Sequence, residues 1–294
     1  MKKIKDYLQL VKLSLSIMVV FSSVISFLLT QGSDDYVRGR WTMILLLFAG
    51  GMLVTGSANA INQVVEKDTD ALMKRTASRP VASGRMSVTE GWIFSILTGA
   101  LGVFILGNYF NWLAAGLAAF SLFLYAFIYT PLKKVNSIAV LVGAVPGALP
   151  CLIGWAAGDN NLGTGGWVLF AFQFFWQFPH FWAIAWVAHK DYSTAGFKLL
   201  PADKGPTKFT ALQTIMYSLL LIPVTLAPYF IGMCSYDDVQ GIISLVLIGL
   251  ANLFMIGRCV TLYRKMDVSS ARQVMFGSYM YLPIVMLALL LSKV

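Results

Sequence analysis

Apolar residues along this chain occur in long unbroken blocks that are separated by short polar breaks. Each block is about 20 residues long, which is the length of α-helix that crosses the hydrocarbon core of a bilayer. A β-barrel would instead show short segments of alternating polarity. The pattern therefore predicts an all-α polytopic membrane protein with nine transmembrane helices, at residues 11–30, 42–65, 90–109, 111–130, 137–157, 166–188, 211–233, 239–260 and 273–292.

The third and fourth segments are separated only by the brief polar break from Asn108 to Asn111. A single helix over both segments would have about 40 residues and be about 60 Å long, which is far too long for one span. Two helices joined by a tight turn are therefore predicted here.

Charged residues support this count of segments. If the N-terminus is cytoplasmic, 19 of the 22 Lys and Arg residues fall on cytoplasmic connections, and only Arg38, Arg40 and Lys293 fall outside. Cytoplasmic loops of membrane proteins are rich in Lys and Arg. The net charge of +9 is therefore explained by topology, and no nucleic-acid partner is expected.

Composition favours one domain embedded in the bilayer over residues 1–294. Hydrophobic residues make up 58% of the chain and charged residues 12%, and no soluble domain or low-complexity linker is visible. The isolated Cys151, Cys234 and Cys259 suit neither disulfides nor a structural metal. The basic start, Met1 to Lys5, precedes a long apolar stretch with no small-residue cleavage site, so a retained first helix is expected.

Three acidic side chains and four basic ones follow the second apolar segment closely. If that helix continues past Val65, then Asn62, Glu66 and Asp70 lie four residues apart and project from one face. Amide and carboxylate oxygens suit Mg²⁺, which proteins bind through one or two carboxylates together with substrate phosphates.

The bases that follow this acidic column have two interpretations. Lys74, Arg75 and Arg79 lie within reach of an anion held by such a metal. Spacing alone equally allows a solvated helix end in which the acids pair with Lys67 and Lys74.

Two further clusters fall at predicted cytoplasmic helix ends. Tyr129, Lys133 and Lys134 precede a segment rich in Gly and Pro, which permits close approach of a helix or a flat ligand. Residues 173–201 carry both histidines and many aromatic side chains. Aromatic faces can stabilise an allylic cation or sandwich a porphyrin, and a histidine such as His180 could ligate or orient haem iron. Ordinary helix packing and an aromatic belt would explain each piece separately.

The residues of these clusters carry a resemblance to a known family. Asn62-x-x-x-Glu66-x-x-x-Asp70, continued by the string MKRTASRP at 73–80, resembles the signature loop of the UbiA superfamily of intramembrane prenyltransferases. The continuation, together with WQFPHFWAIAW at 176–186, resembles the protohaem IX farnesyltransferase (haem O synthase) branch. The chain departs from the family pattern at Glu66, where Asp is usual. It also departs at Val187, where the wider superfamily has an acid four residues before Asp191.

The resemblance implies a fold, a reaction and a set of functional residues. The nine helices would surround a central cavity, in which a farnesyl group passes from farnesyl diphosphate to a vinyl group of protohaem IX (haem b) and gives haem O. The implied Mg²⁺ ligands and catalytic residues are Asn62, Glu66, Asp70 and Asp191. The implied diphosphate-binding residues are Arg75, Arg79, Lys133 and Lys134. The implied haem and prenyl pocket consists of Tyr129, Trp176, His180, Phe181 and Trp182.

The same resemblance implies a cellular setting. The protein would lie in the lipid bilayer of the bacterial cytoplasmic (inner) membrane with its active site facing the cytoplasm. A haem A synthase or terminal oxidase assembly factors would be its protein partners.

Two other functions are compatible with parts of the pattern. A UbiA-type prenyltransferase for an aromatic or quinone precursor is disfavoured by the missing acid at Val187 and the presence of His180. A transporter of anionic lipids would be expected to show internal repeats, and the acidic column is not repeated in the second half of the chain.

Overall fold

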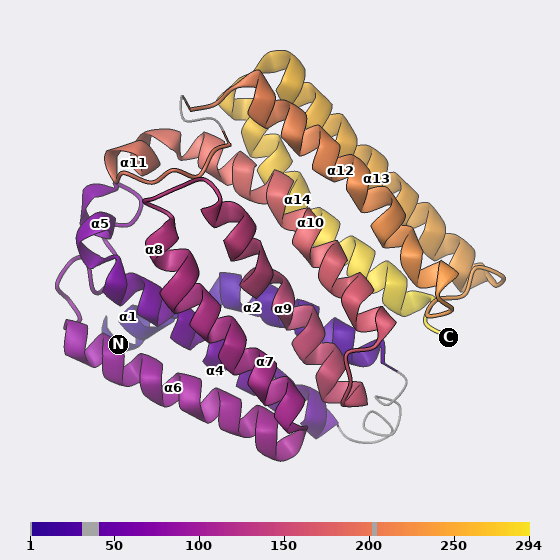
Figure 1. Cartoon of the computed structure of the whole chain (residues 1–294), viewed down its shortest axis with the longest axis horizontal. Helices are drawn as coiled ribbons and strands as arrows, with labels where there is room; N and C mark the ends of the chain where they lie inside the picture. The colour runs from indigo at the N-terminus through magenta and orange to yellow at the C-terminus, as the bar shows by residue number, and fades with distance from the viewer. Residues whose placement is uncertain (1, 31–40, 202–204) are drawn as a thin grey trace.

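Helices occupy all nine predicted segments in the computed structural model, which describes residues 2–30, 41–201 and 205–294 (Figure 1). Arg38, Arg40 and Lys204, which entered the charge count, lie outside the described residues. The helices in the first half of the chain are α1 (Lys2–Leu10), α2 (Leu13–Leu28), α4 (Trp41–Val65), α5 (Lys67–Leu72), α6 (Val88–Tyr109), α7 (Trp112–Phe123), the π-helical η1 (Leu124–Tyr129) and α8 (Thr130–Leu132). Those in the second half are α9 (Ala139–Asp159), α10 (Thr164–Val187), α11 (His189–Thr194), α12 (Lys208–Phe230), α13 (Val239–Lys265) and α14 (Val268–Leu291).

The membrane-spanning helices agree closely with the predicted count. Within the described residues seven helices are long and apolar enough to cross a bilayer, and α1 with α2, bent by 46°, adds an eighth. Helix α10 has 24 residues, which is long enough to span. Its two glutamines, its histidine and its four tryptophans make it less hydropathic than the others.

The predicted break between the third and fourth segments is confirmed, and a side chain explains it. The carbonyl oxygen of the Asn111 side chain accepts a hydrogen bond from the Ala114 backbone N–H at 2.8 Å and so caps α7. Its amide nitrogen donates to the Ala156 carbonyl at 2.6 Å. The turn is thereby fixed to the end of α9.

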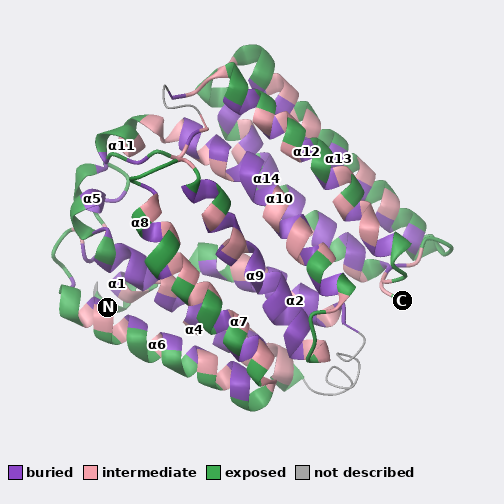
Figure 2. Cartoon of the chain, viewed as in Figure 1, coloured by how far each residue is buried: buried purple, intermediate pink, exposed green. Residues whose placement is uncertain are grey.

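Two apolar cores lie on either side of α2 and α9. One core joins these two helices to α10, α12, α13 and α14, and the other joins them to α4, α6 and α7. Figure 1 shows the two groups as the orange-to-yellow and the purple halves of the molecule, and Figure 2 shows buried residues concentrated on α9, α10 and α14. The inner helices therefore pack on several sides, whereas α6 and α13 turn long exposed faces outward.

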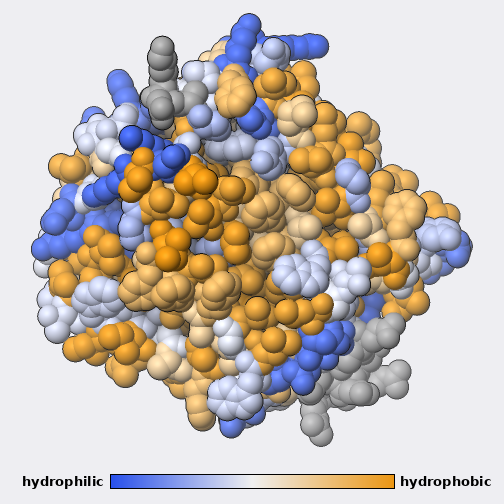
Figure 3. Space-filling view, viewed as in Figure 1, coloured by the Kyte–Doolittle hydropathy of each residue, from blue (hydrophilic) through white to orange (hydrophobic). Residues whose placement is uncertain are grey.

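The outer surface has the distribution expected of a membrane protein. Large exposed apolar side chains such as Leu97, Leu101, Leu250 and Leu253 lie on α6 and α13. In Figure 3 the hydrophilic surface gathers over α5 and α11 at one end and near the C-terminus at the other, with hydrophobic surface between them. The acyl chains of a lipid bilayer would cover this apolar middle zone.

Candidate active site

The loops after α4 and α10 meet over a cavity of about 460 Å³ at the end of the bundle that the charge pattern assigns to the cytoplasm. Loops held on a rigid scaffold commonly carry function. The polar residues that line this cavity are Lys12, Asn62, Glu66, Asp70, Arg75, Arg79, Tyr125, Tyr129, Lys133, Tyr192 and Tyr279.

The acidic column is formed by α4 and α5 together. Helix α4 ends at Val65, but the N–H of Glu66 still bonds to the Asn62 carbonyl at 2.9 Å, and the N–H of Asp70 bonds to the Glu66 carbonyl at 2.7 Å. The four-residue spacing therefore survives the change of helix. All three side chains line the cavity, and each is less than a tenth exposed.

Each acid of the column forms an ion pair with a base that is not one of its neighbours at four residues along the helix. The Arg79 guanidinium donates to both carboxylate oxygens of Asp70 at 2.7 Å. The Lys133 ammonium donates to Glu66 at 2.9 Å. Lys67 and Lys74, the partners that spacing alone allowed, are exposed.

Burial makes these pairs energetically important. Removing one partner of a buried ion pair leaves the other charge uncompensated, which costs about 3–5 kcal/mol. Asp70 is fully buried and the side chain of Arg79 is 14% exposed. The pairs therefore hold the column and its bases in fixed positions around the cavity.

Lys12 is a functional candidate that the sequence reasoning missed. It lies at the bend between α1 and α2 in the left-handed region, with φ 48°, and its ammonium donates to the side-chain oxygen of Asn62 at 3.2 Å. A lysine that interrupts an apolar run (LQLVKLSLS) was the available signal.

Aromatic rings line the wall next to Lys133. Its ammonium lies 4.6 Å from the ring centroid of Tyr129 and 5.8 Å from that of Phe197, within the range of cation–π attraction. A Cβ atom at Gly143 in α9 would lie 2.5 Å from the Tyr129 ring. Glycine is therefore required there if the ring is to keep its position.

The two loops hold each other in place. Met73 packs with Ala195 and Phe197, the Arg75 N–H donates to the Asp191 carboxylate at 3.4 Å, and the Lys198 N–H donates to the Lys133 carbonyl at 2.9 Å. The side chain of Asp191 thus supports the loop after α5 and is not among the residues that line the cavity.

Several other predicted site residues lie away from the cavity wall. Lys134 is exposed. His180 stacks on Trp176 with 4.9 Å between ring centroids, and its Nδ1 lies 2.7 Å from the Ser278 hydroxyl oxygen. Trp182 packs against Phe178 and Tyr217.

The expected haem and prenyl pocket is only partly represented in the lining of this cavity. Of the five residues expected to form it, Tyr129 and Phe181 line the cavity, while Trp176, His180 and Trp182 are buried behind it. His180 contacts the ring of Tyr279, which does line the cavity, at 4.8 Å between centroids. The reason is helix rotation, because large aromatic residues lie on most faces of α10 and the polar Gln177 and His180 are bonded to neighbouring helices, so its sequence does not fix which face turns toward the cavity.

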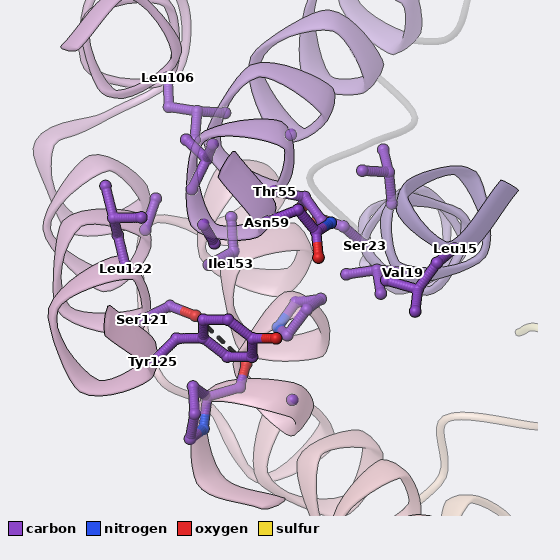
Figure 4. A pocket seen from close by; sticks show the side chains of 18 residues that line it. Leu15, Val19, Ser23, Thr55, Asn59, Leu106, Ser121, Leu122, Tyr125 and Ile153 are labelled. Carbon is purple, nitrogen blue, oxygen red and sulfur yellow. Dashed lines mark hydrogen bonds between the residues drawn. The ribbon is translucent and has the colours of Figure 1, made fainter. Parts of the chain in front are cut away.

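A smaller apolar chamber of about 110 Å³ lies next to the cavity. Leu15 and Tyr125 line both spaces. Figure 4 shows Leu122 and Ile153 facing Val19 and Leu15 across the chamber, which lies between α2, α4, α7 and α9. Leu106 of α6 lies at its far end. Polar and apolar spaces thus adjoin, as an amphiphilic ligand requires.

The acidic column fits Mg²⁺ by its donor chemistry. Glu66, Asp70 and Asn62 offer oxygen atoms as ligands. The Nδ2 atom of Asn62 is buried with no hydrogen-bond partner in the described chain, so its N–H groups can donate to an anionic oxygen of a ligand held beside the metal. No three His, Cys, Asp or Glu groups within the described residues lie close enough together to hold an ion by themselves. Substrate phosphates would therefore have to complete the coordination, as is common for Mg²⁺.

Comparison with known proteins places these features in a family. The family model for UbiA prenyltransferases matches residues 19–282. A protohaem IX farnesyltransferase of Cytophaga hutchinsonii is 43% identical, with 98% of this chain and 97% of the relative covered. The mitochondrial protohaem IX farnesyltransferase of Arabidopsis thaliana is 36% identical, with 98% of this chain and 65% of the relative covered.

Solved structures share the fold at much lower sequence identity. A digeranylgeranylglyceryl phosphate synthase has a TM-score of 0.78 at 20% identity, with 99% of each chain covered. A UbiA homologue from Archaeoglobus fulgidus, bound to GPP and Mg²⁺, has a TM-score of 0.70 at 15% identity, with 97% of this chain and 99% of that chain covered.

Proposed function

The chain belongs to the UbiA prenyltransferase family, and we propose that it transfers a farnesyl group from farnesyl diphosphate to a vinyl group of protohaem IX. It is an integral membrane prenyltransferase, and the product of the proposed reaction is haem O. The observation that carries the proposal is the buried acid–base cluster in a cavity that adjoins an apolar chamber. The relatives named as protohaem IX farnesyltransferases support the choice of substrates.

The buried end of the cavity would hold the diphosphate. Arg79, Lys133 and Lys12 bring three bases to one wall, and charge-assisted hydrogen bonds to phosphate oxygens are strong. These bases would stabilise the negative charge that develops on the leaving group as its bond to C1 of the farnesyl chain breaks. The acid–base pairs hold these bases in position before the substrate binds. Little free energy is therefore needed to reorganise them during the reaction.

Asn62, Glu66 and Asp70 would hold Mg²⁺ together with the diphosphate, and Asp191 remains a proposed ligand for a second ion. A bound Mg²⁺ would supply Lewis-acid neutralisation of the diphosphate oxygens. A solved UbiA homologue contains this ion together with its prenyl diphosphate. The chain's own contribution is to supply the oxygen ligands next to the bases.

Aromatic side chains would protect the allylic cation that remains. Tyr125, Tyr129, Phe181 and Tyr279 line the cavity and can present ring faces to positive charge. The terminal carbon of the vinyl group would attack C1 of this cation. Water would then add to the cation formed on the porphyrin side chain and lose a proton, which gives the hydroxyethylfarnesyl group.

We place the reaction in a bacterial cytoplasmic membrane, with the cavity facing the cytoplasm. The cavity lies at the end of the bundle that carries nearly all Lys and Arg residues, and these are typical of the cytoplasmic side. The whole chain would act as a single intramembrane domain. Haem O would then pass to a haem A synthase or to terminal oxidase assembly factors.

One assay tests the proposed reaction. Purified protein with Mg²⁺, farnesyl diphosphate and haem b should yield a haem whose mass has increased by one farnesyl group and one hydroxyl group. Haem of unchanged mass, together with consumption of an aromatic acid acceptor offered in parallel, would instead assign the chain to the aromatic or quinone type of prenyltransferase.

The apolar chamber gives a prediction about prenyl chain length. A volume of about 110 Å³ accommodates about four groups of methylene or water size at about 30 Å³ each, which is close to the distal isoprene unit of a farnesyl chain. Leu106 lines the chamber at the end away from Tyr125 (Figure 4) and is 1% exposed. Leu106→Ala should therefore raise the use of geranylgeranyl diphosphate relative to farnesyl diphosphate by about tenfold, measured as the ratio of kcat/KM values.

The control for this prediction is Leu97→Ala, because Leu97 lies on the same helix but is 64% exposed on the outer face. The ratio is compared only in protein that remains monodisperse, since loss of a buried leucine side chain costs about 2–5 kcal/mol of stability. An unchanged ratio in Leu106→Ala would show that the chain end lies elsewhere.

A further inference from the structure

The basic residues that line the cavity fall into two groups. Lys12, Arg79 and Lys133 lie in the buried group, where the charges of Glu66 and Asp70 surround them. Arg75 lies apart from these at the exposed mouth. Its electrostatic neighbours are the phenol groups of Tyr192 and Tyr279. One cavity thus offers two separate sites for anions.

The guanidinium of Arg75 is held in position without being neutralised. It donates to the Tyr192 hydroxyl at 3.2 Å and lies 5.7 Å from the centroid of the same ring. Within residues 2–30, 41–201 and 205–294 no carboxylate lies within ion-pair distance of it. Asp191 accepts a hydrogen bond from the backbone N–H of Arg75 instead. The fork of N–H donors is therefore oriented and available for an incoming anion.

The wall beside Arg75 suits a flat apolar ring. Phe181 of α10 and Met275 and Tyr279 of α14 line the cavity together with Tyr192 of α11. Aromatic and thioether groups pack well against planar ligands. A ring against this wall would keep its carboxylate substituents at the water-exposed mouth, where their desolvation costs least.

We infer that Arg75 binds a propionate carboxylate of the porphyrin acceptor at the cavity mouth and thereby selects the acceptor. This inference rests on the proposed function and assigns Arg75 to the acceptor instead of the diphosphate. The diphosphate has three other bases at the buried end. A guanidinium matches the two oxygens of a carboxylate in a bidentate arrangement, which a lysine cannot reproduce.

The test compares Arg75→Gln with the wild type on two acceptors, protohaem IX and its dimethyl ester, in which both propionates are masked. The wild type should prefer the free acid by about 10- to 100-fold in kcat/KM, the range expected for a hydrogen-bonded charged pair. Arg75→Gln should lose most of this preference while its KM for farnesyl diphosphate stays unchanged. Lys74→Gln, which removes an exposed charge one residue away and outside the cavity lining, should keep the preference.

Two results would overturn the inference. One is a wild type that uses the ester as well as the acid. The other is a raised KM for farnesyl diphosphate in Arg75→Gln with the acceptor preference intact. That result would show that Arg75 binds the diphosphate.

A binding measurement distinguishes failure of this inference from failure of the proposed function. Titration of the two haems, followed by the Soret band, requires no turnover and should show the same loss of discrimination in Arg75→Gln. A wild type that binds and discriminates the two haems but never changes the mass of either would contradict the reaction and leave the role of Arg75 supported. A wild type that transfers the prenyl group without such discrimination would contradict only the role of Arg75.

Discussion

Asp70→Asn is expected to lower farnesyl transfer by at least about 10³-fold while the protein remains folded. Asp70 is fully buried, lines the cavity and holds Arg79 through both carboxylate oxygens. The amide keeps the size of the side chain but loses the charge that a divalent cation and Arg79 both require. Loss of several kcal/mol of charge stabilisation in the transition state corresponds to a decrease of this size.

The measurement is the rate of haem O formation under saturating substrates, together with the melting temperature in detergent. Asp68→Asn is the matched control, because Asp68 lies two residues away on α5 but is exposed and outside the cavity lining. It should retain turnover close to the wild-type rate. A folded Asp70→Asn protein with the same rate as Asp68→Asn would remove Asp70 from the mechanism.

Removal of divalent cations should have an effect of similar size. Treatment with a chelator is expected to stop transfer, and added Mg²⁺ should restore it, because the diphosphate leaves with negative charge that the bases alone neutralise incompletely. The rate is followed by haem mass analysis after passage through metal-free buffer. Sustained turnover of the metal-free protein would mean that Lys12, Arg79 and Lys133 suffice for the reaction.

The sequence predicted the helices and the acidic column well, for identifiable reasons. Blocks of apolar residues must match the bilayer thickness, so the nine segments could be placed within a few residues of the observed helices. The spacing of Asn62, Glu66 and Asp70 needed only local helical geometry. That geometry continues through the junction at Glu66 because its backbone hydrogen bonds keep the four-residue pattern.

Partners of the acids could not be predicted in the same way. Glu66 pairs with Lys133, which is 67 residues away in the sequence, so the contact depends on how α4 and α8 come together in space. The position of Lys12 at the cavity could not be predicted, because the hydropathy pattern does not indicate the bend with positive φ at that residue. The same limit applies to His180, whose direction depends on the rotation of α10, a helix with large aromatic residues on most of its faces.

The most direct test of the account measures farnesyl diphosphate binding to the wild type and to Asp70→Asn, each with and without Mg²⁺, by calorimetric titration in detergent. The account predicts tight binding only for the wild type with Mg²⁺, and weak, Mg²⁺-independent binding for the variant. Equal affinities in all four titrations would contradict the claim that the column at residues 62–70 binds the donor through a divalent cation.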